Sequence, residues 1–244
     1  MFEGVFQQKQ VLVSGGSSGI GLAIARGFQA AGASVTVTGL TAPELVEART
    51  AGLAVAALDV GDLAACTALM ATFTSLDVLV NCAGMIRRAS AEHDPVEFER
   101  VINVNLNGTQ RLCALARPVL KASARKPGGS IVNTASMRSF MGAAITPAYS
   151  ASKGGVMQLT KSLAIAYAAD GIRVNAIAPG WVATALTQPL RDDPAANQAV
   201  LERTPMKRWA DPSDMAGPVL FLCSPAAAFI TGVILPVDGG YLVY

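Results

Sequence analysis

A phenol and an amine in the second half of the chain have the types and the spacing of an acid–base pair. Tyr149 and Lys153 are four residues apart, so a helix brings both side chains to the same face. A tyrosine ionises near pH about 10, and an adjacent ammonium lowers its pKa by favouring the phenolate. Such a phenol can supply the proton that a carbonyl oxygen needs when a hydride reaches its carbon. The pair alone indicates little, because an ordinary helix surface carries the same residues.

Ser136 and Asn105 add a hydroxyl and an amide to this pair. Ser136 lies thirteen residues before Tyr149, just past the apolar run 131–134, where open parallel sheets bind their ligands. Its hydroxyl can polarise a substrate oxygen. Asn105 falls inside a predicted helix although Asn is a poor helix former. Its place there needs a special reason, such as a local kink that binds water.

A glycine-rich turn follows the first apolar run of the chain. Residues 14–21 read SGGSSGIG, and the helix-like segment 22–26 comes next. Glycines are needed where a chain turns tightly and where backbone approaches a pyrophosphate. The helix that follows offers unpaired N–H groups and a partial positive charge to phosphates. Strand, turn and helix in this order predict a dinucleotide site, although a turn without a ligand would use the same residues.

Short runs rich in Val and Ile alternate with longer Ala- and Leu-rich segments of helical period. This alternation predicts βαβ units, and strands buried on both faces of a parallel sheet show such continuous apolar runs. We expect helices at 22–30, 95–120 and 151–168, and about seven strands at 10–14, 34–38, 54–58, 78–81, 130–134, 173–178 and 233–236. The predicted fold class is α/β, a Rossmann-type doubly wound parallel sheet with helices on both faces.

The chain shows no internal boundary. No charge run, repeat or low-complexity linker divides it, so we expect a single dinucleotide-binding and catalytic domain over residues 1–244. Residues 123–129 form a predicted polar loop. The less regular stretch 184–209 is a candidate substrate lid.

Composition excludes several classes of protein. The 244 residues are 52% hydrophobic and 15% charged, which excludes a disordered chain. The formal net charge is +2 without a basic run, so nucleic acid is not an expected partner. No apolar stretch reaches the about 18 residues of a membrane helix and no secretory signal is seen, so we expect no membrane partner and a cytoplasmic protein. The four cysteines lack C-x-x-C spacing and His93 is the lone histidine, which predicts reduced thiols and no metal site.

Further motifs accompany these residues. Asn81-Cys82-Ala83-Gly84 ends the fourth predicted strand, Asp59-Val60 ends the third, and the segments 179–184 and 237–240 follow the last two. Together with the glycine turn and the order of Asn105, Ser136, Tyr149 and Lys153, they resemble the short-chain dehydrogenase/reductase family over nearly the whole chain. Cys82 departs from the family's Asn-Asn-Ala-Gly. The resemblance implies that these four residues are a catalytic tetrad, and that the protein moves a hydride between a nicotinamide cofactor and a secondary alcohol or ketone.

The resemblance also implies which residues bind the cofactor. Tyr149 and Lys153 would meet the nicotinamide nucleotide, with Lys153 on its ribose hydroxyls. Family members commonly assemble into tetramers, so we expect a homotetramer. The other implied cofactor residues are Gly15, Ser17, Ser18, Gly19, Ile20, Gly21, Gly39, Leu40, Asp59, Val60, Asn81, Ala83, Gly84, Pro179, Gly180, Val182 and Thr184.

The sequence gives only a weak indication of whether the cofactor is NAD or NADP. NAD is usually held by an acid at the end of the second strand, and NADP by a nearby cation. Neither is present, because that strand end reads Thr38-Gly39-Leu40-Thr41 and no acid occurs from Val5 to Pro43. Segments such as 83–88 and 136–140 are similar to the branch of the family that acts on deoxy-keto sugar acids, which uses NAD without this acid. We therefore expect NAD, with NADP left open.

Three residues are expected at the substrate: Arg88, Arg138 and Trp181. The two arginines follow strand ends, and a guanidinium can bind a carboxylate through two parallel hydrogen bonds. This predicts a small-molecule substrate, a sugar acid or a related polyol. Two alternatives remain. One is a 3-oxoacyl-carrier-protein reductase that uses NADPH, and the other is a nicotinamide-nucleotide-binding regulator without turnover, against which the intact tetrad argues.

Overall fold

The fold is a parallel sheet whose strands alternate with helices along the chain. The computed structural model describes residues 2–123 and 128–244, so residues 124–127 of the predicted polar loop lie outside the described residues. The described chain forms a 7-stranded sheet with the order β3-β2-β1-β4-β5-β6-β7 and parallel pairing throughout, which confirms the predicted fold class. Its strands are β1 (Gln10–Ser14), β2 (Ser34–Gly39), β3 (Ala54–Ala57), β4 (Val78–Asn81), β5 (Ser130–Thr134), β6 (Arg173–Pro179) and β7 (Ile234–Val237).

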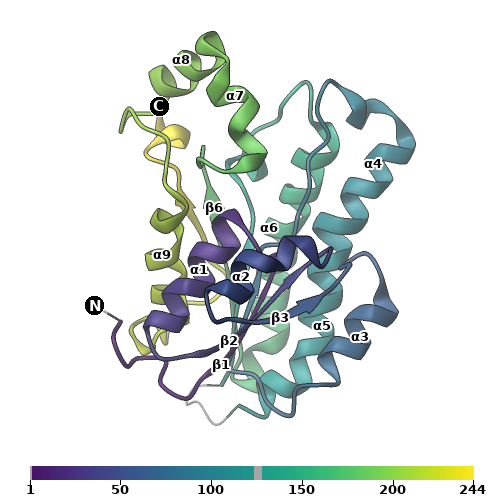
Figure 1. Cartoon of the computed structure of the whole chain (residues 1–244), viewed down its shortest axis with the longest axis vertical. Helices are drawn as coiled ribbons and strands as arrows, with labels where there is room; N and C mark the ends of the chain where they lie inside the picture. Colours follow the sequence, from purple (N-terminus) through teal and green to yellow (C-terminus); the bar gives the residue numbers. More distant parts are fainter. Residues whose placement is uncertain (1, 124–127) are drawn as a thin grey trace.

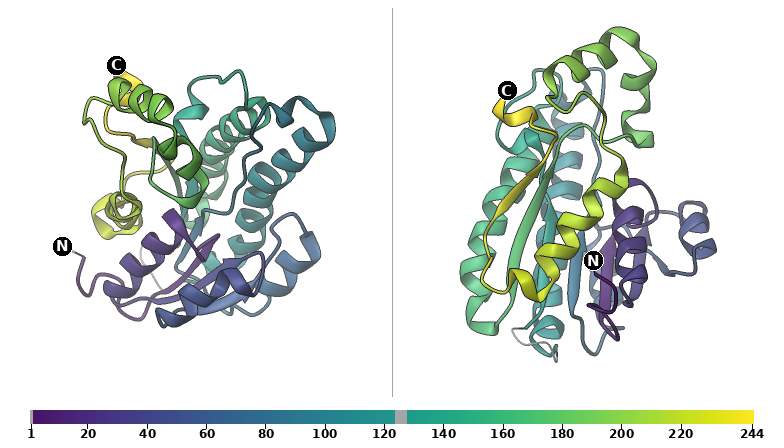
Figure 2. Two further views of the ribbon diagram at one scale, coloured as in Figure 1. Left: turned by 45° about the horizontal axis from the view of Figure 1, so that its top comes forward. Right: turned by 90° about the vertical axis from the view of Figure 1, so that its left-hand side faces the viewer.

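Helices cover both faces of the sheet (Figures 1 and 2). One face carries α1 (Gly19–Ala30), α2 (Val46–Thr50) and α9 (Ala216–Cys223), and the other carries α3 (Leu63–Met70), α5 (Gly108–Lys121) and α6 (Pro147–Tyr167). Successive β1 residues alternate between the two apolar cores, with Val11 and Val13 in one and Leu12 in the other. This double burial explains why the strands are continuous apolar runs.

The order of the strands reverses between β1 and β4. These two strands are neighbours, although β2 and β3 lie between them in the sequence. At such a point the connections leave in opposite directions, and a crevice opens beyond the carboxyl ends of the strands. The glycine turn after β1 and the Cys82–Gly84 segment after β4 therefore border one crevice.

The segment 95–120 is not the continuous helix that its periodicity predicts. It contains α4 (Pro95–Ile102), a π-helical turn η3 (Asn103–Asn107), and most of α5. The Asn105 side chain explains the interruption, because its Nδ2 donates to the Met85 carbonyl at 2.9 Å and its Oδ1 accepts from the Met85 N–H at 2.8 Å. The predicted irregularity at Asn105 is thus a π-helical turn, a feature that often marks functional sites.

Other boundaries differ less from the prediction. The ends of the strands differ from the predicted ends by one residue or not at all. The helices α1 and α6 begin three and four residues earlier than predicted, respectively. Pro147 is the first residue of α6, a position that suits proline because its ring sets the helical φ and its missing N–H is not needed there. The candidate lid contains α7 (Gln188–Asp192) and α8 (Pro194–Arg203), which lie beyond the carboxyl end of β6 (Figure 1). Within residues 2–123 and 128–244, no helix is both long and apolar enough to cross a bilayer.

Candidate active site

A cleft of about 600 Å³ opens at the reversal of the strand order. Its walls come from the glycine turn, the ends of β2 and β4, the segment after β3, and the first residues of the candidate lid. The predicted cofactor residues that line it are Gly15, Ser17, Ser18, Gly19, Ile20, Gly21, Gly39, Leu40, Asp59, Val60, Ala83, Gly84 and Thr184.

The glycine turn is shaped by close backbone contacts. Gly15 has a φ of +67°, and a Cβ atom on it would lie 2.5 Å from the Ala83 backbone nitrogen. A Cβ atom on Gly21 would lie 2.2 Å from the Gly15 carbonyl oxygen. Ser18 is the N-cap of α1, but its side chain caps no backbone N–H of the described chain. The first N–H groups of α1 therefore face the cleft region without a capping side chain, as a phosphate site requires.

The end of β2 brings a carboxylate to the cleft that sequence reasoning missed. The Leu40 N–H donates to Glu44 Oε2 at 3.0 Å, and both residues line the cleft beside Ser17 and Ser18. Glu44 lies in the first turn of the short helix η1 (Pro43–Leu45), five residues beyond Gly39. The signal in the sequence was the Pro-Glu pair, because proline opens a helix that turns the glutamate back toward the strand end.

The end of β4 is built by buried polar contacts. Asn81 Nδ2 donates to Asn133 Oδ1 at 2.9 Å and contacts Cys113 Sγ at 3.3 Å, so the Asn81 side chain is buried between the sheet and α5 and does not line the cleft. Cys82 lines the cleft and accepts a hydrogen bond from Thr134 Oγ1 at 3.3 Å. Burial raises the pKa of the Cys82 thiol to about 11, although the Thr134 contact and the Lys153 charge oppose this. The departure from Asn-Asn-Ala-Gly thus places a neutral thiol at this position.

The four predicted catalytic residues lie together at the margin of this cleft. A Cβ atom on the wall residue Gly84 would lie 3.4 Å from Asn105 Oδ1 and 3.7 Å from Lys153 Nζ. Asn105 Nδ2 donates to Ser152 Oγ at 3.0 Å, and Ser152 Oγ donates to the Tyr149 carbonyl at 2.8 Å. The π-helical turn and the first turns of α6 are therefore joined directly.

Lys153 and Tyr149 are fixed by different surroundings. Lys153 Nζ donates to the Thr134 carbonyl at 2.7 Å and lies 5.7 Å from the centroid of the Tyr149 ring. Burial lowers the pKa of Lys153 to about 8. Burial also raises the pKa of Tyr149, opposed by a hydrogen bond with Ser136 and by the charge of Arg138. In the free protein the charge that lowers the pKa of Tyr149 is therefore that of Arg138, and not that of Lys153 as expected. The Lys153 ammonium is costly to bury, and it lies over the Tyr149 ring.

Ser136 is held by the turn that follows β5. Its side chain accepts from the Arg138 N–H at 3.1 Å, and its own N–H donates to Ser139 Oγ at 3.3 Å. Ser139 Oγ in turn donates to the Lys153 carbonyl at 2.6 Å. This short helix η4 (Met137–Ser139) thus anchors the serine hydroxyl to the helix that carries Tyr149.

The three predicted substrate residues have different locations. Arg138 Nη1 donates to the Gly142 carbonyl at 2.9 Å, and its charge acts on Tyr149. Arg88 donates to the Leu186 carbonyl of the candidate lid. Trp181 lines a second pocket of about 210 Å³ that shares no lining residue with the cleft, and its ring meets that of Trp209 edge to face at 5.6 Å. The structure thus brings Arg138 to Tyr149 and Arg88 to the candidate lid, but it places none of the three predicted substrate residues on the lining of the cleft.

The remaining predicted cofactor residues follow β6. Gly180 is packed against Asp238, since a Cβ atom on it would lie 2.7 Å from the Asp238 Cα atom. Val182 is buried and forms a bridge with Ala210, while Pro179 ends β6. These residues hold the base of the candidate lid and do not line the cleft of the described chain.

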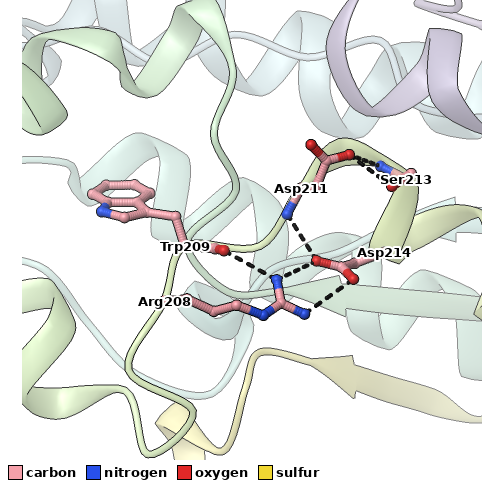
Figure 3. A network of polar contacts seen from close by, with 5 residues as sticks. All are labelled: Arg208, Trp209, Asp211, Ser213 and Asp214. Atoms are coloured by element: carbon pink, nitrogen blue, oxygen red, sulfur yellow. Dashed lines mark hydrogen bonds and ion pairs between the residues drawn. The ribbon is translucent and has the colours of Figure 1, made fainter.

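An ion-pair network fixes the C-terminal end of the candidate lid at its base (Figure 3). Arg208 Nη1 and Nη2 bind Asp214 Oδ2 and Oδ1 at 2.6 and 3.1 Å, and the Asp211 N–H donates to Asp214 Oδ2 at 2.8 Å. The Val182–Ala210 bridge joins the two ends of the segment. Residues 184–209 therefore leave and rejoin the domain at one point, while Thr184–Leu186 border the cleft.

Comparisons with known proteins give matches that extend over nearly the whole chain. The sequence family described as enoyl-(acyl carrier protein) reductase matches residues 15–242. The 2-dehydro-3-deoxy-D-gluconate 5-dehydrogenase of Bacillus subtilis (strain 168) is 42% identical over 244 residues, covering 96% of this chain and 94% of that protein. The galactitol 2-dehydrogenase (L-tagatose-forming) of Cereibacter sphaeroides is 41% identical over 242 residues, covering 95% and 94%.

A solved structure extends this similarity to three dimensions. The crystal structure of a putative 2-deoxy-D-gluconate 3-dehydrogenase from Agrobacterium tumefaciens, with bound NADP, superposes with a TM-score of 0.87 at 42% identity. The match covers 100% of this chain and 99% of that one. The names of these three relatives are those of dehydrogenases of sugar acids or of a polyol.

Proposed function

Since this chain belongs to the short-chain dehydrogenase/reductase family, we propose that it is an NAD-dependent dehydrogenase of a sugar acid or a related polyol. The observation that carries the proposal is that Asn105, Ser136, Tyr149 and Lys153 lie together beside a cleft of about 600 Å³, held by hydrogen bonds through Ser152, Ser139 and the Thr134 carbonyl. Sequence identities of 42% and 41% to a sugar-acid dehydrogenase and a polyol dehydrogenase support the substrate class.

The residues of the cleft fit a nicotinamide dinucleotide. Gly15 and Gly21 let the turn pack directly on the Ala83 backbone and on itself, and the uncapped first N–H groups of α1 are then available to a pyrophosphate. Asp59 and Val60 would border the adenine, and Thr184 would border the nicotinamide end with Pro179, Gly180 and Val182 supporting it. When bound, the nicotinamide ring accepts the hydride from the substrate carbon or returns it.

The residues of the tetrad divide the remaining chemistry. In alcohol oxidation Tyr149 takes the hydroxyl proton as the substrate carbon becomes a carbonyl, and in reduction it gives that proton back. Ser136 donates a hydrogen bond to the substrate oxygen and stabilises charge that develops there. Lys153 binds the ribose hydroxyls and keeps a positive charge near the phenolate. Asn105 holds the β4 loop against α6, which fixes the distance between cofactor and acid.

The preference for NAD rests on Glu44. The Glu44 carboxylate lies beside Gly39 and Leu40 on the cleft wall and occupies the Leu40 N–H, so a ribose phosphate there would meet a negative charge and lose a donor. Two like charges about 4 Å apart in water repel by about 1 kcal/mol, which corresponds to a preference of roughly fivefold. The bound NADP of the Agrobacterium relative makes this a property to be measured on this chain.

Specificity constants for the two cofactors test this preference. The specificity constant for NAD⁺ should exceed that for NADP⁺. Glu44→Gln should reduce the ratio of the two constants, because the amide oxygen can still accept from the Leu40 N–H but carries no charge. Glu47→Gln, an exposed glutamate of α2 that pairs with Arg26, is the matched control. A clear preference of the parent for NADP⁺ would contradict the proposed NAD dependence.

A substrate screen separates the proposed activity from its alternatives. Sugar acids, polyols and acetoacetyl thioesters are each assayed with both cofactors, and the proposal expects turnover of a sugar acid or polyol. Reduction of the 3-keto group of an acetoacetyl thioester would instead identify a 3-oxoacyl-carrier-protein reductase. Isothermal titration in parallel identifies a regulator, which would bind the nucleotide without turning over any substrate.

We also propose a homotetramer in the cytoplasm. Large apolar side chains at Ile165, Phe229, Val243 and Tyr244 are exposed in the single chain, which is typical of surfaces covered by assembly. All four cysteines are free thiols, as a reducing compartment favours. Light scattering after size exclusion would give about four times the chain mass of 25.1 kDa if the tetramer forms.

A further inference from the structure

A fully buried carboxylate lies next to the tetrad and has no part in the chemistry described above. Glu92, in the short helix η2 (Ala91–His93), has an exposed fraction of 0%. Its Oε1 accepts from the Arg87 N–H at 2.9 Å, and its Oε2 accepts from the Tyr149 N–H at 2.8 Å. Among the residues that the structure describes, no lysine, arginine or histidine forms an ion pair with it.

The contact with Tyr149 completes the start of α6. The first N–H groups of a helix have no partner inside the helix, and the N-cap Thr146 supplies no side-chain bond to the described chain. Glu92 reaches this turn from 57 residues away. A carboxylate is favoured at a helix N-terminus because it meets the positive end of the helix dipole.

The second contact ties the same carboxylate to the wall of the cleft. Arg87 follows Gly84 and Met85 in the loop after β4, and Arg87 lines the cleft. One side chain therefore joins the backbone that would face the cofactor to the backbone that carries the phenol. A carboxylate can accept from both N–H groups at once, whereas an amide would set its NH₂ against one of these donors.

We propose that Glu92 is a positioning residue that holds the backbone of Tyr149 at a fixed distance from the cofactor wall of the cleft. This inference rests on the proposed function, because it assigns Tyr149 to proton transfer. Errors of about 1 Å in the placement of a reacting group can cost up to about 100-fold in rate. The buried charge is retained, on this view, because two charged hydrogen bonds define one geometry.

The charge of Glu92 also acts on the Tyr149 phenol. Glu92 raises the pKa of Tyr149 in addition to burial, while the Ser136 hydrogen bond and the Arg138 charge lower it. Lys153 faces the ring from α6 itself. Loss of the Glu92 charge therefore moves the ionisation of Tyr149 to lower pH, an effect that a purely structural residue far from the phenol would not have.

Three variants test the proposal. Glu92→Gln removes the charge and one acceptor, Glu92→Asp keeps the charge but is one methylene too short, and Glu99→Gln changes an exposed glutamate of α4 as the matched control. We expect kcat to fall about tenfold or more in both Glu92 variants, with the dissociation constant for NADH unchanged. In Glu92→Gln alone, the rise of kcat for alcohol oxidation with pH should move to lower pH. Glu99→Gln should behave as the parent in each measurement.

A spectroscopic titration keeps this test separate from the substrate assignment. The ultraviolet ionisation signal of Tyr149 is the difference between the parent and Tyr149→Phe, and it should move to lower pH in Glu92→Gln whether or not any sugar acid is turned over. A protein that turns over no sugar acid or polyol contradicts the proposed function, but this titration still tests Glu92. A folded Glu92→Gln with unchanged kcat and unchanged tyrosine titration overturns the proposal. If Gln prevents folding, an unchanged kcat in Glu92→Asp overturns it, and failure of both variants to fold would do so by assigning Glu92 to stability.

Discussion

Lys153 Nζ lies 5.7 Å from the centroid of the Tyr149 ring while it donates to the carbonyl at the end of β5. The four-residue spacing on α6 brings the two side chains to one face, and the sheet fixes the amine. Burial raises the pKa of Tyr149 and lowers that of Lys153, while the charges of Arg138 and Glu92 act on the phenol in opposite directions. In the free protein burial therefore favours the neutral form of both side chains.

Tyr149→Phe should lose nearly all turnover and still bind NADH. The substitution removes the proton donor and acceptor, whose loss costs about 100- to 10,000-fold in rate, but it keeps the ring and leaves Lys153 in place. The measurement is kcat beside the dissociation constant for NADH from fluorescence. Turnover equal to that of the parent would show that another group transfers the proton.

Lys153→Met should change how stability depends on pH. Burial lowers the pKa of Lys153 from 10.5 to about 8. Between these values the unfolded chain binds a proton that the folded chain does not, so Lys153 makes the free energy of unfolding rise with pH in this window. The stability of the Met variant relative to the parent should fall by up to about 3 kcal/mol from pH 8 to pH 10.5. Denaturant unfolding of the free proteins at both pH values measures it, and a constant difference would contradict it.

The sheet could be predicted from the sequence because its strands are buried on both faces. Burial forces continuous apolar runs such as Val78–Asn81, which periodicity detects. The interruption at Asn103–Asn107 could not be predicted as a π-helical turn, because it depends on the Met85 backbone, which is distant in sequence. Local propensity indicated only that Asn105 was out of place in a helix.

Within the candidate site, residues whose positions are set by local sequence could be predicted, and residues placed by distant contacts could not. Tyr149 and Lys153 could be found because one helix sets their spacing. Glu92 could not, since an acid in a polar segment before a helix predicts a solvated side chain, and its burial depends on the packing of η2 against α6. Glu44 was not predicted as a site residue, because it lies beyond the strand end in the sequence and a proline turn brings it back to the end of β2. Trp181 lies in the expected motif, but its ring meets Trp209 at the base of the lid.

The thiols of the native protein should react slowly with iodoacetamide at pH 7.5. Burial raises the pKa of Cys82 to about 11 and that of Cys113 to about 12, and the thiolate is the reactive form. Cys66, Cys113 and Cys223 are buried, while Cys82 is partly exposed on the cleft wall and is expected to react slowly because of its raised pKa. Mass spectrometry should detect four modified cysteines only after denaturation, and rapid native labelling of Cys82 would contradict the raised pKa of its thiol.

Arg208→Ala should loosen the candidate lid without unfolding the domain. The Arg208–Asp214 pair is partly exposed, so its loss should cost less than about 1 kcal/mol of unfolding free energy. The lid residues that border the cleft would be held less firmly, and we expect the KM for substrate to rise about threefold or more through poorer positioning. Steady-state kinetics and thermal unfolding measure both effects, with the exposed Arg49→Ala as control. An unchanged KM would separate this network from substrate binding.

Arg138→Lys and Arg88→Lys should weaken the binding of a sugar acid more than that of an uncharged polyol. Arg138 lies two residues after Ser136 and acts on Tyr149 through its charge, while Arg88 donates to the lid carbonyl of Leu186, a residue that lines the cleft. Each now donates to a backbone carbonyl, a contact that a carboxylate can replace with two parallel charged hydrogen bonds. Lysine keeps the charge but loses the planar fork, so the KM for the acid should rise about tenfold while that for the matching polyol changes little. Arg138 should show the larger effect, because its backbone is tied directly to the Ser136 side chain. If the parent has equal kinetics for acid and polyol, the carboxylate is not recognised and both arginines serve only the loops that they hold.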